Sequence, residues 1–327
     1  MAATSPANPV PEKSTLAGSQ HGDRVFSAIL VASSLVAIFV LGLLAFVLIR
    51  DSGPSLNQFG FSFLTGTDWD PAAKEVFGAA TYIFGTIITS AIALLLATPL
   101  AIGAALYVTE YAPRTLGIVV AFTVELLVTI PSVVYGLWGL KVLAPFLATN
   151  VEPFLQNTFG NIPLVGQLFQ GPTTGRDIFA AGVILAIMIL PTILSITREI
   201  ITQVPRLQKE GMLALGATKW ETIRYAILPF AKGGIAGAAM LGFARAVGET
   251  MAVTMIIGNV TGNISATLFA PSATIASVIA NQAGDTAGPM HYSAILELGL
   301  ILMVLASVFN IAARLFVKRI TQLPMAK

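Results

Sequence analysis

The chain has 327 residues, of which 55% are hydrophobic and 10% charged, and it carries a net charge of +2 and no cysteine. Soluble domains carry about 25% charged residues, so this composition favours one integral membrane domain over domains that fold in water. The small net charge argues against nucleic-acid binding. The lack of cysteine excludes a disulfide framework, a cysteine nucleophile and a cysteine-ligated metal.

The first segment, residues 1–24, is rich in Pro, Ala and Ser and has no periodic apolar pattern. This composition predicts a disordered cytoplasmic tail. Val25–Ile49 follows without a charge. It is too long for the apolar core of a signal peptide, which has about 7–15 residues. We therefore predict that it is the first membrane-spanning helix.

Five more apolar segments can each reach the roughly 20 residues that a helix needs to cross a bilayer. In lipid the backbone must satisfy its own polar groups, which predicts helices rather than open strands. The expected fold is therefore an all-α integral membrane protein with six transmembrane helices in one domain, residues 25–320. After the first span, the helices are expected within residues 77–108, 116–143, 178–197, 233–258 and 293–317.

The basic residues orient these helices. With the N-terminus in the cytoplasm, 13 of the 18 Lys and Arg residues fall on the cytoplasmic side, three fall in outer loops, and Lys141 and Arg245 fall inside spans. This distribution follows the positive-inside rule, so both termini are expected in the cytoplasm. We find no convincing internal repeat, which favours a subunit that forms its pathway by dimerising over a secondary transporter.

A polar segment at about residues 198–232, which we call the elbow, is expected to form a cytoplasmic loop. It holds six basic and three acidic residues. Gly216 can adopt a left-handed turn, Thr218 can begin a helix with a capping box, and Pro229 is expected to close the segment. This pattern predicts two short helices that present Trp220 to a soluble partner. An amphipathic connector that lies on lipid headgroups explains the same residues.

The fifth span carries Arg245 and Glu249, which are four residues apart and would share one face of a helix. An arginine near mid-membrane costs at least about 2.5 kcal/mol, so it is normally paired or faces water. One interpretation is a structural ion pair. The other is a substrate pathway in which Arg245 meets an anion and Glu249 occupies its charge when the site is empty.

Chemistry favours a protonated oxyanion for such a pathway. Guanidinium matches a tetrahedral oxyanion bidentately. The Glu249 carboxylate would repel sulfate, but it could accept a hydrogen bond from a protonated phosphate. Ser132 and Tyr135 follow Pro131, which indicates either a simple kink or a further oxyanion contact. Glu125 and Glu297 also lie inside spans, and for both we favour a structural role over a pathway role.

The elbow resembles a loop of known transporters. Glu210, Gly216, Leu228 and Pro229 have the spacing of the loop by which ABC-importer permeases dock on their ATPase subunit, although residues 211–212 are not the alanines that the family favours. The resemblance implies that the elbow contacts an ATPase and transmits its closure. The residues that we expect to make this contact or to shape the elbow are Glu210, Gly216, Thr218, Trp220 and Pro229.

Two further runs, Ile130–Gly136 and Arg245–Val253, resemble those of the PstC-type permeases of bacterial phosphate ABC transporters. The likeness extends from about residue 25 to the C-terminus. It implies a role of Arg245 and Glu249 in phosphate passage, and a multi-pass protein of the bacterial inner membrane. It also implies a PstA-type sister permease, two copies of a PstB-type ATPase and an extracytoplasmic phosphate-binding protein. The short motifs are shared with the sister permease, so the PstC type rests on the long first outer loop and the first run.

Other functions explain fewer of these features. A permease for another oxyanion, such as sulfate or molybdate, would share the elbow, whereas the Arg245/Glu249 pair argues against it. The elbow argues against an uncoupled secondary transporter or channel. The chain has two histidines and no HExxH motif, which argues against a membrane enzyme, and it has no GxxxxGK[ST] motif. We therefore expect no catalytic residue, metal or cofactor in this chain, and ATP hydrolysis by a separate subunit.

Overall fold

The computed structural model describes residues 19–163, 165–262 and 264–322. Within these ranges six helices are long and apolar enough to cross a membrane, which confirms the predicted all-α membrane fold. The predicted tail lies outside the described residues up to residue 18. Residues 19–24, which were predicted to belong to the tail, are helical. Helix α1 (Ser19–Asp51) begins at Ser19, whereas the sequence predicts that it begins at Val25.

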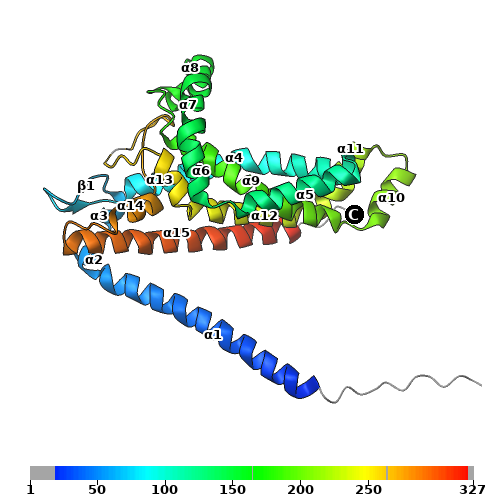
Figure 1. The fold of residues 1–327 in the computed structure, drawn as a ribbon, viewed down its shortest axis with the longest axis horizontal. Coiled ribbons are helices and arrows are strands. Elements are labelled where there is room, and N and C mark those ends of the chain that lie inside the picture. The colour runs from blue at the N-terminus through cyan, green and yellow to red at the C-terminus, as the bar shows by residue number, and fades with distance from the viewer. Residues whose placement is uncertain (1–18, 164, 263, 323–327) are drawn as a thin grey trace, which may run out of the picture. The chain divides into compact units, whose positions relative to one another are not determined.

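The residues up to Arg50 and those from Asp51 onward form two compact units. The first consists, in its described part, of α1, whose side chains are almost all exposed. The second unit holds a bundle of four long helices that run side by side (Figure 1). These are α4 (Ala80–Leu106), α9 (Ile178–Thr202), α12 (Leu228–Val247) and α15 (Pro289–Gln322).

Helix α9 is the centre of the bundle. In its most apolar stretch 67% of the residues are buried, against 22% for α4 and α15. Glycines let neighbouring helices approach it closely. A Cβ atom on Gly242 of α12 would lie 2.7 Å from the Cδ1 atom of Ile193, and one on Gly182 would lie 2.5 Å from the Cγ2 atom of Ile92 in α4. Contact of this kind is typical of helices packed in membranes.

The prediction that residues 116–143 form a single membrane-spanning helix is wrong. Helix α5 (Arg114–Thr129) runs with the bundle and ends before Ile130 and Pro131, which are both extended. Proline lacks an N–H and disfavours helical backbone at the residue before it, so the helix stops there.

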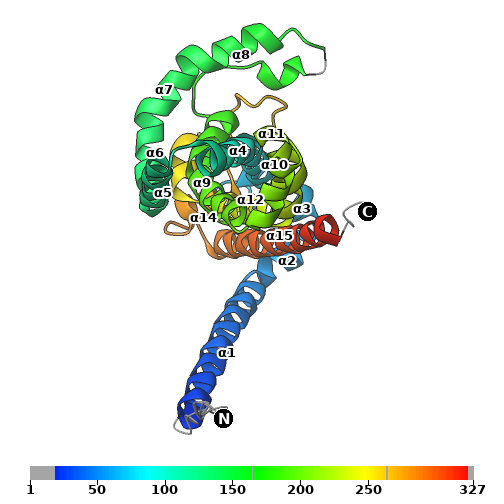
Figure 2. The same cartoon turned by 90° about the vertical axis from the view of Figure 1, so that its right-hand side faces the viewer.

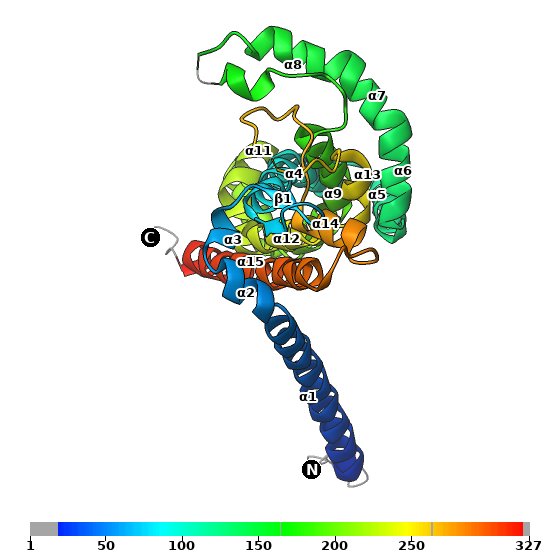
Figure 3. The same ribbon diagram turned by 90° about the vertical axis from the view of Figure 1, so that its left-hand side faces the viewer.

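A second helix follows this break and leaves the bundle. It curves around the outside of the bundle as an arch (Figures 2 and 3). The arch spans residues 132–159 and consists of α6 (Ser132–Trp138), η2 (Gly139–Leu143), α7 (Ala144–Phe146), η3 (Leu147–Val151) and α8 (Glu152–Phe159).

The fifth predicted span is divided as well. Helix α12 ends at Val247, and residues 248–250 separate it from α13 (Met251–Ile256). At its other end the helix is longer than expected, because α11 (Lys219–Thr222), η5 (Ile223–Ile227) and α12 are continuous over 29 residues.

Pro229 therefore lies inside a helix and does not close the elbow. It follows η5, a single turn of π-helix, in the first turn of α12. The wider π turn accommodates a residue without an N–H, so the helix continues.

The sequence predicts two short helices in the elbow. The structure shows one short helix, and the second predicted helix is the beginning of the long helix that starts at Lys219. Helix α10 (Arg206–Ala214) ends near Gly216, whose φ angle is +84°. The predicted capping box is present at the start of α11. The Thr218 N–H donates to Glu221 Oε2 at 2.7 Å, and the Glu221 N–H donates to Thr218 Oγ1 at 3.3 Å. The elbow lies at the end of the bundle opposite to β1 (Figure 1).

A second apolar core lies at that opposite end. Trp69 is 7% exposed, packs edge-on against Phe77 and Tyr82, and donates from Nε1 to Gln282 Oε1 at 2.9 Å. His291 stacks on Phe77 at 5.7 Å between ring centroids. The elements are α2 (Gly53–Phe59), α3 (Ser62–Thr65), the antiparallel pair β1 (Trp69–Asp70) and β2 (Val76–Phe77), and α14 (Ile275–Gln282).

Two buried carboxyl groups fasten the arch to α9. After α8 the chain passes through η4 (Gly166–Phe169) and returns. The N–H of Gly175 donates to Glu152 Oε2 at 3.2 Å, and Asp177 Oδ1 accepts from the Ala180 N–H at 2.8 Å as the N-cap of α9. Both acids are fully buried. Burial raises the pKa of Asp177 to about 6, because a desolvated carboxylate is less stable than one in water.

Candidate functional site: a charged break between α12 and α13

Arg245 lies in the last turn of α12 and is half-buried. Its Nη1 atom donates to the Thr192 Oγ1 atom at 3.0 Å. Thr192 belongs to α9 and follows Pro191, a proline inside that helix. Within the described residues the Arg245 guanidinium has no carboxylate partner at ion-pair distance. The guanidinium therefore donates to a neutral hydroxyl, which does not neutralise its charge, so the charge can attract an anion.

Glu249 is not on the same helix as Arg245. It lies in the break of residues 248–250, where Gly248 caps α12. Its Oε1 atom accepts from the Ala252 N–H at 3.3 Å, in the first turn of α13. The predicted i, i+4 placement on one helix face is therefore wrong. Arg245 lies on α12 and Glu249 lies in the three-residue connection to α13, so the distance between the two charges can change when the helices move.

Tyr135 and Ser132 lie at the start of the arch. The Tyr135 hydroxyl donates to the Leu127 carbonyl of α5 at 2.9 Å, across the break after α5. Ser132 is the first residue of α6 and is half-buried.

Close backbone packing joins the two broken helices. A Cβ atom on Gly136 of α6 would lie 2.6 Å from the Met255 Sδ atom and 3.1 Å from the Ala252 Cα atom, both of α13. The two helices that follow breaks therefore pack against each other. This contact brings Tyr135 toward the break that holds Glu249, and it needs glycine at position 136.

The elbow has large apolar side chains that are exposed and not packed in any core of the described structure. Leu207 is 84% exposed, Leu215 is 86% exposed and Trp220 is 57% exposed. The predicted contact residues Glu210, Gly216 and Thr218 are exposed beside them, whereas Pro229 is half-buried in the long helix. Exposed apolar residues grouped on a polar segment mark a contact surface.

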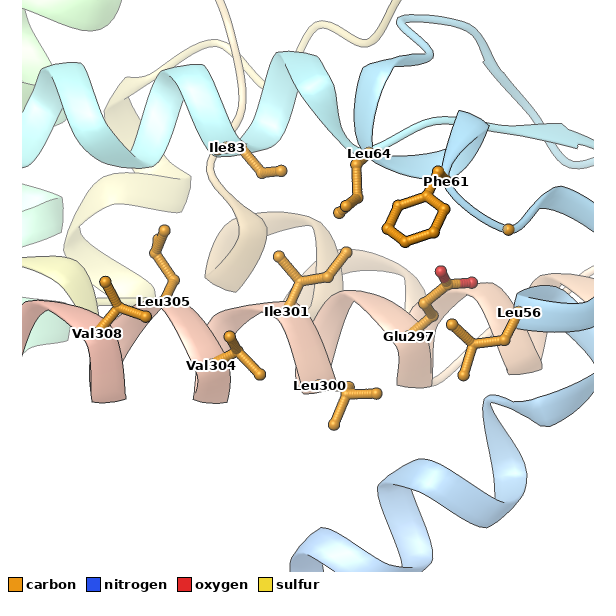
Figure 4. A pocket seen from close by; sticks show the side chains of 11 residues that line it. Leu56, Phe61, Leu64, Ile83, Glu297, Leu300, Ile301, Val304, Leu305 and Val308 are labelled. Carbon is orange, nitrogen blue, oxygen red and sulfur yellow. The ribbon is translucent and has the colours of Figure 1, made fainter.

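The two acids inside spans have different surroundings. Glu125 is exposed on α5, and a carboxylate at that place would be costly if it faced lipid. Glu297 is 2% exposed on α15. Figure 4 shows it at one end of an apolar groove of 590 Å³, across which aliphatic side chains of α15 face Leu64 and Ile83. None of the predicted pathway residues is among the described residues that line this groove.

Sequence reasoning did not identify Thr192. The one feature of the sequence that could have pointed to Thr192 is its position directly after Pro191 in an apolar helix. Its partner Arg245 lies 53 positions further along the chain, so spacing does not reveal the contact. In the part of the chain that the structure describes, no three His, Asp or Glu side chains gather as metal ligands would.

Comparisons with known proteins agree with this architecture. A family model described as "Binding-protein-dependent transport system inner membrane component" matches residues 97–322. The Mesorhizobium japonicum protein named "Phosphate transport system permease protein PstC" is 45% identical over 91% of this chain and 90% of that protein. The Haemophilus influenzae protein of the same name is 43% identical over 89% of this chain and 92% of that protein.

Solved structures share the fold at low identity. A chain of a bacterial alginate ABC transporter, solved in complex with an alginate-bound periplasmic protein, has a TM-score of 0.60 and 20% identity. It covers 93% of this chain and 99% of its own length. A chain of the inward-facing MetNI methionine ABC transporter has a TM-score of 0.55 and 16% identity, and it covers 74% of this chain and 95% of its own length.

Proposed function

This chain belongs to the family of binding-protein-dependent transport system inner membrane components, and we propose that it is the membrane-spanning permease subunit of an ATP-driven phosphate importer. It would form the translocation pathway together with a sister permease. ATP hydrolysis would be carried out by a separate ATPase subunit, and the chain itself would be no enzyme.

The observation that carries this proposal is the state of Arg245. An arginine inside a membrane-spanning segment is normally neutralised by a carboxylate, because an unpaired charge is costly there. Here its hydrogen-bond partner is the Thr192 hydroxyl. The guanidinium keeps its full charge and further N–H donors, which suits bidentate binding of a tetrahedral oxyanion.

Glu249 supports phosphate over a fully deprotonated oxyanion. A carboxylate close to the path repels sulfate or molybdate, whereas a protonated phosphate can donate a hydrogen bond to it. The relatives with 38–45% identity over about nine tenths of the chain are named phosphate transport permeases, which supports the same substrate. Tyr135 and Ser132 would line the path beside the charged pair.

Three surfaces support the proposed partners. The elbow, with its exposed Leu207, Leu215 and Trp220, would dock on a PstB-type ATPase subunit, of which the importer would hold two copies. The exposed Glu125 face of α5 would meet a PstA-type sister permease or the water of the shared pathway rather than lipid. The elbow end and both termini would then be cytoplasmic, and the end that carries Trp69 would receive an extracytoplasmic phosphate-binding protein.

The transport cycle would use these parts in order. ATP binding closes the ATPase pair, the elbow moves with it, and the helices rock so that the site opens toward the loaded binding protein. Phosphate enters past Arg245, and ATP hydrolysis returns the pathway to the inward-open state. The break between α12 and α13 lets Arg245 and Glu249 separate around the anion and approach each other when it leaves.

Thr192 is expected to matter through Arg245. Replacement by valine keeps the shape of the side chain but removes the acceptor. A hydrogen bond to a charged group contributes about 1.5–3 kcal/mol, so T192V is expected to lower phosphate uptake about tenfold. T192S keeps the hydroxyl and is expected to stay within about twofold of the parent protein. Equal uptake by T192V and T192S would show that the hydroxyl does not position the guanidinium.

Substrate identity can be tested in proteoliposomes that hold this chain, its sister permease and its ATPase. We expect labelled phosphate to accumulate when the phosphate-binding protein and ATP are supplied. Replacing that protein by a sulfate-binding protein should give no sulfate uptake. Sulfate uptake at a comparable rate would assign the permease to another oxyanion, and phosphate flux without the ATPase would assign it to the uncoupled transporters.

A further inference from the structure

The elbow is fastened to the end of α4 by a charged contact. Helix α4 continues into η1 (Tyr107–Tyr111), a single turn of π-helix that carries Glu110. The Lys209 Nζ atom of α10 lies 2.6 Å from Glu110 Oε1. The side chains of Lys209 and Glu110 are only 23% and 18% exposed. The pair is therefore largely shielded from water and joins residues 99 positions apart.

A second contact reaches the same turn from the other helix of the elbow. The Lys219 Nζ atom, at the start of α11, lies 5.4 Å from the centroid of the Tyr111 ring, a distance typical of a cation–π interaction. Glu110 and Tyr111 are consecutive residues. Both elbow helices thus place a lysine on one π-helical turn, and such turns are frequent at functional sites.

The two elbow helices differ in what else holds them. The helix that starts at α11 is anchored by Ile223 and Ile227, which are buried in a cluster with Ala105 of α4 and Ile201 of α9. Helix α10 has no buried residue. In the described part of the chain, the contact of Lys209 with Glu110 is the only side-chain hydrogen bond or ion pair that α10 makes. Among the described residues, the ion pair is therefore the polar side-chain contact that joins α10 to α4.

We propose that Glu110 and Tyr111 are positioning residues that transmit movement of the elbow to α4. The inference rests on the proposed docking of the elbow on an ATPase. When the ATPase pair closes and pulls the elbow, α10 would move α4 through the Lys209–Glu110 pair, and α11 would move it through Tyr111. Without the pair, α10 could follow the ATPase while the bundle stays behind, so ATP would be hydrolysed without transport.

Charge reversal tests this role in the assembled importer. Phosphate uptake and ATP hydrolysis are measured in the same proteoliposomes for E110K, K209E and the double variant E110K/K209E. We expect each single variant to assemble and hydrolyse ATP, but to lower the phosphate transported per ATP about tenfold, within the range of coupling between contacting residues. The double variant restores the opposite charges, and its ratio should return to within about twofold of the parent protein.

Two controls separate the possible outcomes. Glu199 is an exposed acid in the last turns of α9, at the start of the elbow, so E199K makes the same charge change without breaking the pair and should keep the parent ratio. Y111F keeps the aromatic ring and Y111L removes it, so only Y111L should lower the ratio. An unchanged ratio in both single variants, or no recovery in the double variant, would overturn the inference while leaving the proposed function intact. A parent complex that shows no ATP-dependent uptake would overturn both.

Discussion

Replacing Arg245 with alanine is expected to abolish phosphate uptake while the importer still assembles. The substitution removes the one guanidinium at the break between α12 and α13, and it leaves the Thr192 hydroxyl without its donor. The substitution also removes the two donors of a bidentate contact with the anion, and each such charged hydrogen bond contributes about 1.5–3 kcal/mol, which together correspond to a loss of at least about a hundredfold. Uptake of labelled phosphate by reconstituted complexes measures the effect.

The lysine variant R245K serves as the matched control. It keeps the charge but lacks the planar fork of donors, so its uptake should lie between those of R245A and the parent protein. Stimulation of ATP hydrolysis by the loaded binding protein should persist in both variants, because residue 245 lies outside the elbow. Uptake by R245A at the parent rate would place phosphate passage elsewhere in the molecule.

Polar substitutions on the elbow are expected to prevent recruitment of the ATPase. Leu207, Leu215 and Trp220 expose most of their side chains on a segment that we place outside the membrane. Tryptophan is enriched among the residues that contribute about 2 kcal/mol or more at the centre of an interface, and the two leucines would add apolar contact around it. Replacing all three with serine should therefore weaken ATPase binding by at least about a hundredfold, measured by pull-down in detergent.

The fold of the elbow should survive these changes, because its anchors Ile223 and Ile227 are untouched. The exposed Val260, between α13 and α14, offers a control, since V260S removes apolar surface at another place and should leave ATPase binding unchanged. ATPase binding at parent strength by the triple serine variant would assign the elbow to a connector that lies on lipid headgroups.

Much of the fold was predictable because it depends on composition and local chemistry. The long apolar runs predict α1, α4, α9 and α15 from the cost of burying polar groups in lipid. The capping box of Thr218 and the turn at Gly216 were predictable because the residues involved lie within a few positions of each other. Arg245, Glu249 and Tyr135 were recognisable as charged or polar groups in apolar surroundings.

The breaks within spans could not be placed from the pattern alone. Pro131 ends α5, but a proline can also kink a helix without ending it, so the sequence alone did not fix this break. Residues 248–250 contain no proline, and the packing of α13 on α6 at Gly136 is not visible in the sequence pattern. The assumption of an unbroken helix put Arg245 and Glu249 on one face. The contacts of Thr192 with Arg245 and of Glu110 with Lys209 join residues 53 and 99 positions apart, which sequence spacing does not reveal.

Phosphate transport by this chain should require a separate ATPase that drives it. Proteoliposomes that contain the chain, its sister permease and its ATPase provide the direct test, with the phosphate-binding protein outside and ATP inside. We predict that labelled phosphate accumulates only when the ATPase, the phosphate-binding protein and ATP are all present. We also predict that R245A abolishes the accumulation. Accumulation that needs no ATP, or no accumulation with all components present, would contradict the proposal that this chain is the permease of an ATP-driven phosphate importer.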